Sequence, residues 1–361
     1  MPKPLRVTIW ILAALLLVAA GWVLYLYAAA GQFRDLVEKP IGECMRVAGA
    51  PGAEDIAIDR DHAVALVSSD DRRTGGPGAI YAYDLRAGGE PRPLTGAAAS
   101  AGGPDSAPPA PAGSGPGVLH PHGLSLVGGA GSASLMVVNH PAESDSVEIY
   151  DWNGERLAHR RTVTDPLLYN LNDVAALDAE RFYATNDHGG PRDRETREDY
   201  LRLRRGNVVF WDGARARKVA DGIAYANGIT LSEDALEVYV ASTTTGRILV
   251  YDRDDETDDL TLRKEIPLRT GVDNFALDLY GGLWVAAHPK LLTFAAHAKE
   301  PAKRSPWEVL WVDPSGVAEP SIRPVMLSLG EELSGASVAA PWGDQLVVGS
   351  VFEPHFLVCK R

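Results

Sequence analysis

Polar residues stand in this sequence where buried strands should be apolar. The stretch YNLNDVAALDAERFYATNDHGG, residues 169–190, has the pattern of two short strands joined by a turn. Asn172 and Asp173 open the first strand, whereas Asn186, Asp187 and His188 close the second. In an antiparallel pair these positions lie at the same end. Amides, carboxylates and imidazoles gathered there could bind a cation or move protons.

The same arrangement occurs six times along the chain. The copies begin at Glu54, His122, Asn172, Asn227, Asp273 and Ser337. Their spacing of roughly 46 to 68 residues is close to that of four-stranded propeller blades. Apolar strand patterns such as GAIYAYDL and GRILVYDRD lie between the copies. We therefore predict an all-β six-bladed β-propeller over residues 32–361, with a flexible Ala/Gly/Pro/Ser surface loop at 96–117.

A propeller would bring the polar ends of these strands to one place, because the innermost strand of each blade lines the central channel. The residues expected near the channel mouth are Glu54, His122, Asn172, Asn227, Asp273 and Asn274 from first strands, joined by His140, Asp187, His188 and His288 from second-strand ends. Two carboxylates and three amides form an all-oxygen set, which suits Ca²⁺. Zinc would prefer nitrogen and sulfur ligands. The alternative interpretation is that these residues only form turns at blade entrances.

Two further features suggest more than one role for this site. Asp55 and Asp173 directly follow two of the expected ligands, and neighbouring strand residues point to opposite faces, so they could hold a second, deeper ion. His122 and His140 begin and end one antiparallel pair, so their rings can touch. One histidine could then take a proton from water while the other supports it.

The N-terminus predicts a membrane segment. Residues 7–30 contain no charged side chain and follow Lys3 and Arg6. Such a run is long enough to cross a bilayer as a single helix. The positive-inside rule would leave the N-terminus in the cytoplasm and place everything after Gly31 outside it, in the periplasm or extracellular space. We therefore expect residues 1–31 to be a membrane anchor, with a cleaved signal peptide as the alternative.

Charge and cysteine content narrow the possibilities further. The net charge of -13 and the pI near 5.2 argue against a nucleic-acid partner. The two cysteines, Cys44 and Cys359, lie near the two ends of the exported part. An oxidising compartment would allow them to pair. A propeller needs its two chain ends to meet in one blade, and this disulfide would fasten that closure.

The sequence resembles the paraoxonases, a family also called arylesterases or serum-type lactonases. The matching stretches include GAEDIAI, PHGLSL, VVNHP, NLNDVAAL, FYATNDH, YANGITLS, VDNFALD, LWVAAHP and VGSVFEPHFLVC, in the order of that family. The resemblance implies a six-bladed propeller with two calcium ions that hydrolyses lactones and aryl esters. One departure is the segment GGPRDRETREDYLRLRRG, which is charged where the family has an aromatic, lipid-facing helix.

The resemblance also implies a role for each matching residue. The catalytic calcium ion would be held by Glu54, Asn172, Asn227, Asp273 and Asn274. The structural ion would be held by Asp55, Asp173 and the main-chain carbonyl of Leu124. His122 would be the base and His140 its partner, with Asp187 and His288 lining the pocket. Two alternatives stay open: a sugar-lactonase of the related calcium propellers, and a non-catalytic propeller that binds a protein or glycan.

Overall fold

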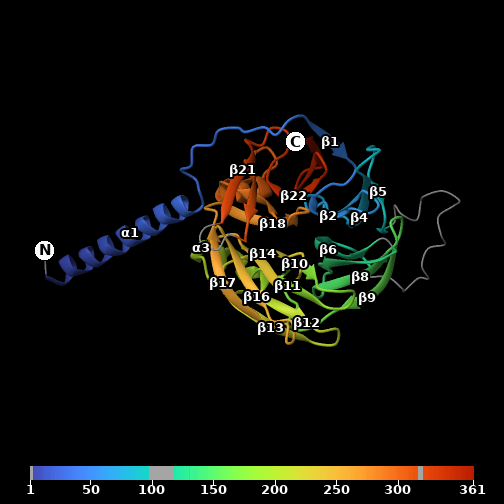
Figure 1. The fold of residues 1–361 in the computed structure, drawn as a ribbon. Coiled ribbons are helices and arrows are strands. Elements are labelled where there is room, and N and C mark those ends of the chain that lie inside the picture. The colour runs from blue at the N-terminus through green and yellow to red at the C-terminus, as the bar shows by residue number, and fades with distance from the viewer. Residues whose placement is uncertain (1–2, 97–116, 130, 316–319) are drawn as a thin grey trace.

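A ring of β-sheets makes up most of the molecule. The computed structural model describes residues 3–96, 117–129, 131–315 and 320–361. In these residues the strands form six four-stranded sheets arranged around a central axis (Figure 1). This confirms the predicted six-bladed propeller. Of the predicted flexible loop 96–117, all but the two end residues lie outside the described ranges.

All neighbouring strands within a blade are antiparallel, and each blade is given from its inner to its outer strand. Blade 1 consists of β2 (Ala53–Asp59), β3 (Val64–Ser69), β4 (Ala79–Asp84) and β5 (Arg92–Pro93). Blade 2 consists of β6 (Pro121–Gly129), β7 (Ser132–Asn139), β8 (Ser146–Trp152) and β9 (Leu157–Val163). Blade 3 consists of β10 (Leu171–Ala176), β11 (Phe182–Asn186), β12 (Gly206–Trp211) and β13 (Ala216–Ile223). Blade 4 consists of β14 (Ala226–Leu231), β15 (Glu237–Ser242), β16 (Arg247–Arg253) and β17 (Leu260–Pro267). Blade 5 consists of β18 (Gly271–Leu277), β19 (Leu283–His288), β20 (Trp307–Asp313) and β21 (Ser321–Ser328). Blade 6 consists of β22 (Ala336–Trp342), β23 (Gln345–Ser350), β24 (His355–Lys360) and β1 (Cys44–Ala48).

The hydrophobic core lies between the blades. Apolar side chains from adjacent sheets pack together, as Ile56 of blade 1 does with Val338 of blade 6, and Val174 of blade 3 with Val138 of blade 2. Burying each such side chain contributes about 1.5 to 3 kcal/mol. The alternating pattern of each strand supplies these contacts, which hold the blades at fixed positions around the channel.

Every inner strand departs from regular pairing near its start. The register between the two innermost strands shifts in all six blades, and in blade 1 the shift falls between Ala53 and Ile56. The two residues inside that break are Glu54 and Asp55. The predicted side-chain ligands on the other first strands lie at the matching positions of their own blades. Such irregularities redirect side chains, so the break turns polar residues away from the ladder and toward the channel.

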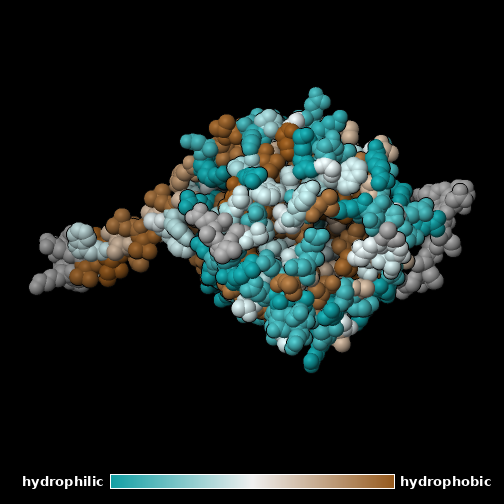
Figure 2. Space-filling model, viewed as in Figure 1, coloured by the Kyte–Doolittle hydropathy of each residue, from teal (hydrophilic) through white to brown (hydrophobic). Residues whose placement is uncertain are grey.

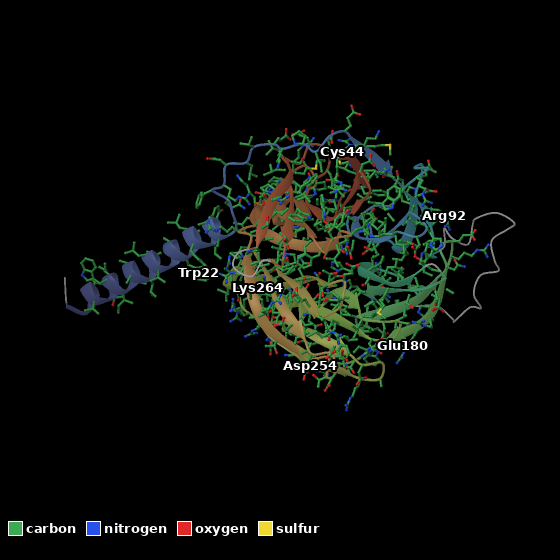
Figure 3. All side chains as sticks on the ribbon, viewed as in Figure 1. Trp22, Cys44, Arg92, Glu180, Asp254 and Lys264 are labelled. Carbon is green, nitrogen blue, oxygen red and sulfur yellow. A yellow bond between two sulfur atoms is a disulfide. The ribbon has the colours of Figure 1, made fainter. Side chains whose placement is uncertain are left out.

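Blade 6 joins the two ends of the chain. Its outermost strand, β1, pairs with β24, and Cys44 lies opposite Cys359 in that pairing. The two sulfurs form a disulfide, as predicted. Cys44 is labelled in Figure 3 on the blade that carries the C-terminus.

Helix α1 (Lys3–Ala29) extends away from the ring (Figure 1). Apolar residues run along its exposed surface (Figure 2), in contrast to the largely polar exterior of the propeller. Its span Val7–Ala29 is long and apolar enough to cross a membrane and has no buried part. The end of α1 contacts the propeller: the Arg202 guanidinium lies 5.6 Å from the Tyr25 ring, and the Ala30 carbonyl accepts the Leu291 amide N–H at 3.0 Å.

Candidate active site

A cavity of about 430 Å³ opens at one end of the central channel. The sequence-predicted residues that line it are Glu54, His122, Asn172, Asn227, Asp273 and His288. Helices α3 (Glu195–Leu201) and α4 (Leu291–Lys299) and the end of α1 also line the cavity, and the side chains that α4 and α1 contribute are mostly apolar. The structure thus brings residues from blades 1 to 5 to one chamber.

Four side-chain oxygens in this cluster are buried and have no hydrogen-bond partner among the described residues. They are Glu54 Oε2, Asn172 Oδ1, Asn227 Oδ1 and Asn274 Oδ1. Buried polar atoms are nearly always satisfied, so four such oxygens on the inner strands of four blades indicate a missing ligand. Carboxylate and amide oxygens are the donors that Ca²⁺ prefers. These residues therefore fit the predicted catalytic calcium site.

The charges of the cluster point the same way. Glu54 Oε1 accepts a hydrogen bond from Asn274 at 2.8 Å and lies 3.4 Å from His122 Nε2. Burial opposes ionisation of Glu54, but His122 and the charge of Arg72 hold its pKa below the ordinary value. Burial raises the pKa of Asp273, although His288 Nε2 contacts this carboxylate at 2.7 Å. Two buried carboxylates so close together are costly unless a cation compensates them.

A second acidic pair lies beside the first. Burial and the neighbouring carboxylates raise the pKa values of Asp55 and Asp173 well above the ordinary value. The Leu124 amide N–H donates to Asp55 Oδ2 and the Ile229 amide N–H donates to Asp173 Oδ2. A Cβ on Gly123 would lie 2.1 Å from Asp173 Oδ1, so only glycine allows blade 2 to approach this carboxylate. The pair has the chemistry of the predicted second ion site.

His122 begins a chain of hydrogen bonds that leads away from the cavity. His122 Nδ1 lies 2.8 Å from His140 Nε2, and His140 Nδ1 lies 2.9 Å from Asp145 Oδ1. Because an ionised carboxylate only accepts, His140 Nδ1 must carry the proton. Burial lowers the pKa of His140, which favours a neutral ring whose Nε2 accepts from His122. With His122 Nδ1 directed at His140, the other ring nitrogen of His122, Nε2, lies 3.4 Å from Glu54 Oε1.

Sequence reasoning missed two members of this chain. Asp145 lies in the loop between β7 and β8, and its Oδ2 accepts the Leu171 amide N–H at 2.8 Å. Burial works against the charge of Asp145, but His140 and Arg192 hold its pKa below the ordinary value. Arg192, in the short 3₁₀ helix η1 (Arg192–Arg194), donates to Asp145 at 2.7 Å. The only sequence signal was an acidic residue five positions after His140, and turns contain many such residues.

The charged segment 189–206 lies over the cavity and forms η1 and α3. His188 lies between Asp187, 2.8 Å from its Nδ1, and Asp199 of α3, 3.0 Å from its Nε2. Burial disfavours the charged imidazole, but these two carboxylates raise the pKa of His188 to about 10. Asp187 is thus committed to His188 and is not among the described residues that line the cavity. Its implied place in the pocket wall stays a prediction.

Comparison with known proteins relates the chain to one family. The sequence profile of a family described as Arylesterase matches residues 110–360. Serum paraoxonase/arylesterase 1 of Rattus norvegicus is 36% identical over 67% of this chain and 68% of its own length. Human serum paraoxonase/lactonase 3 is 32% identical over 84% of each chain. The solved structure of regucalcin from Agrobacterium tumefaciens, titled a calcium-binding protein, shares the fold at a TM-score of 0.53 with 15% identity, covering 90% of this chain and 95% of its own.

Proposed function

The chain belongs to the arylesterase family of hydrolases, and we propose that it is a calcium-dependent hydrolase of lactones and aryl esters acting in the channel cavity. The observation that carries the proposal is the position of His122. His122 lines the cavity, its Nε2 lies 3.4 Å from the carboxylate of Glu54, and its Nδ1 bonds His140. A non-catalytic scaffold has no use for a base held in this way.

Glu54, Asn172, Asn227, Asp273 and Asn274 would hold the catalytic calcium ion, and Asp55, Asp173 and the carbonyl of Leu124 the structural one. Calcium at the first site would polarise the ester carbonyl and stabilise negative charge on its oxygen. His288 fixes the Asp273 carboxylate, because its Nε2 contacts one oxygen at 2.7 Å.

His122 would remove a proton from the attacking water, and His140 and Asp145 would stabilise the positive charge that forms on the ring pair. The bond between the acyl carbon and the ring or aryl oxygen breaks, and the water oxygen forms the new bond to that carbon. The proton taken by His122 passes to the departing oxygen. The products are a hydroxy acid from a lactone, or a carboxylic acid and a phenol from an aryl ester.

A small panel of lactones and phenyl esters, assayed with and without a chelator, tests this proposal. We expect turnover that chelator abolishes and added calcium restores. His122→Gln should slow it by about 10² to 10⁴-fold, the usual contribution of a positioned base. Asp145→Asn should cost less and shift the pH profile. His355→Gln, on the outer part of blade 6, is the matched control. Full activity in His122→Gln would reject the assigned base, and an inactive wild type would favour a binding module.

We also propose that residues 1–31 anchor the propeller, residues 32–361, on the extracytoplasmic side of a membrane. The length and apolar surface of the α1 span support this proposal, together with Lys3 and Arg6 before it. Fractionation of cells should find the full-length chain with the membrane, and external protease should reach the propeller. A soluble mature protein that begins at Gly31 would instead identify a signal peptide.

A further inference from the structure

Arg72 lines the cavity from the loop between β3 and β4. Its terminal nitrogens Nη1 and Nη2 are both buried, and neither has a hydrogen-bond partner among the described residues. Burying a guanidinium without a partner is strongly unfavourable. The adjacent residue shows that this is not a property of the loop. Arg73 donates to the carbonyls of Phe352 and His297 and lies over the Phe352 ring.

The Glu54 carboxylate, whose pKa the charge of Arg72 lowers, does not satisfy Arg72. The charge of Arg72 helps to lower the pKa of Glu54, so the two groups are neighbours, yet no hydrogen bond or ion pair joins them in the described structure. Glu54 Oε1 already contacts Asn274 and His122, and Glu54 Oε2 belongs to the set of oxygens suited to calcium. The fork of Arg72 therefore holds no partner among the described residues that a molecule entering the cavity would have to displace.

The rest of the chamber fits an apolar body between two polar ends. Phe294 and Leu292 of α4, together with Phe352, line the same cavity as Arg72 and His122. A ligand could place a carbonyl near His122 and a second group at the guanidinium. Because Nη1 and Nη2 are both free, they can donate two parallel hydrogen bonds to one carboxylate, which is the geometry that arginine recognises best.

We propose that Arg72 binds a carboxylate of the substrate, so that the preferred substrates are lactones or esters bearing a negatively charged carboxylate on an apolar skeleton. This inference rests on the proposed function and specifies its substrate class. It assigns to Arg72 a role in specificity that none of the calcium or proton-transfer residues supplies.

The test uses two lactones that differ only in a carboxylate or an uncharged carboxamide at one position. The full-length chain, in detergent and with calcium, is compared with Arg72→Met, which keeps an unbranched stem but removes the guanidinium and its charge, and with Arg72→Lys, which keeps the charge but not the fork. Arg215→Met removes a surface arginine, 84% exposed, that pairs only with Asp212 in the described structure, and so controls for net charge. Melting temperatures confirm that each variant is folded.

The measured quantity is kcat/KM for the charged lactone divided by that for the neutral one. A charged hydrogen-bond pair is worth about 10- to 100-fold, so Arg72→Met should lower this ratio by about that factor. Arg72→Lys should fall between, and Arg215→Met should match wild type. An equal ratio in wild type and Arg72→Met would overturn the inference while leaving the proposed hydrolase intact.

A binding measurement separates failure of this inference from failure of the proposed function. Calorimetric titration with glutarate, a dicarboxylate that cannot be hydrolysed, should give heat with wild type and Arg215→Met that is lost with Arg72→Met. That result supports the carboxylate site even if no lactone is turned over. Equal binding, or none, in wild type and Arg72→Met would reject it.

Discussion

The His188 contact between α3 and the propeller gives a pH-dependent stability that a single substitution should remove. His188 is almost fully buried, with 4% of its side chain exposed, and it is held by Asp187 on one side and Asp199 on the other. The folded state raises the pKa of His188 from 6.5 to about 10. Replacing His188 with Gln keeps a polar side chain at this position but removes the titrating charge.

The sign follows from the direction of the shift. A histidine whose pKa is higher in the folded state binds more protons there than in the unfolded chain. Its stabilisation is complete below about pH 6.5 and is lost as the pH rises toward 10. At 1.36 kcal/mol per pH unit, the rise from 6.5 to about 10 corresponds to about 5 kcal/mol at most. Asp199 is 37% exposed, so solvent screening weakens its share, and we expect about 2 to 4 kcal/mol.

Denaturant unfolding in calcium at several pH values between 6 and 10 measures this contribution. Wild type should lose about 2 to 4 kcal/mol more than His188→Gln across that range. Amide exchange in α3 should also become faster in the variant at pH 7, because this ion pair connects α3 to the end of β11. His355→Gln, which changes a half-buried histidine on blade 6, should follow wild type. Parallel pH curves for wild type and His188→Gln would refute the reasoning.

The calcium sites and the ring closure lead to two further predictions. Asp273→Ala should abolish lactone turnover yet keep much of the thermal stability, whereas Asp55→Ala or Asp173→Ala should mainly destabilise. A structural ion contributes about 4 kcal/mol to the unfolding free energy when the calcium concentration is about a thousandfold above its Kd. Calcium titrations of each variant, followed by melting temperature and by lactone hydrolysis, measure the two effects. Equal losses of stability in all three variants would mean that the two sites are not distinct. Replacing Cys44 and Cys359 with Ser should lower the unfolding free energy by up to about 6 kcal/mol, since the bond spans 315 residues. An unchanged denaturant midpoint in the Cys44→Ser/Cys359→Ser variant would show that the disulfide does not stabilise the folded state.

The sequence predicts the ring and much of the site for a simple physical reason. Alternating apolar strands at a repeated spacing require similar blades, and similar blades place equivalent positions, such as Asn172 and Asn227, at equivalent points around the channel. Alternation alone does not reveal the register breaks near Glu54, because a break is a property of how two strands pair. Strand alternation predicts that Asp55 and Glu54 point to opposite faces. In the structure both residues lie inside the register break, so the directions of their side chains depend on that break.

Residues in loops were harder to foresee. Asp145 lies in the loop after β7 and Arg192 lies in η1. They interact because the fold brings this loop and η1 together beside His140. The charges of segment 189–206 indicate that it does not enter lipid. They do not predict that ion pairs hold this segment to the propeller beside the cavity. Arg72 carried no signal at all, since its lack of a partner is visible only when the surrounding side chains are in place.

The shared blade at the chain ends also sets the order of events during synthesis. Strand β1 follows α1 directly, and its only strand partner in the described structure, β24, is formed by His355–Lys360 near the end of the chain. β1 is therefore made first and paired last. Until then it presents an open strand edge, which invites pairing with other chains. Termination before His355 would leave β1 without a partner and Cys44 as a free thiol, so ring completion and disulfide formation together mark a full-length molecule.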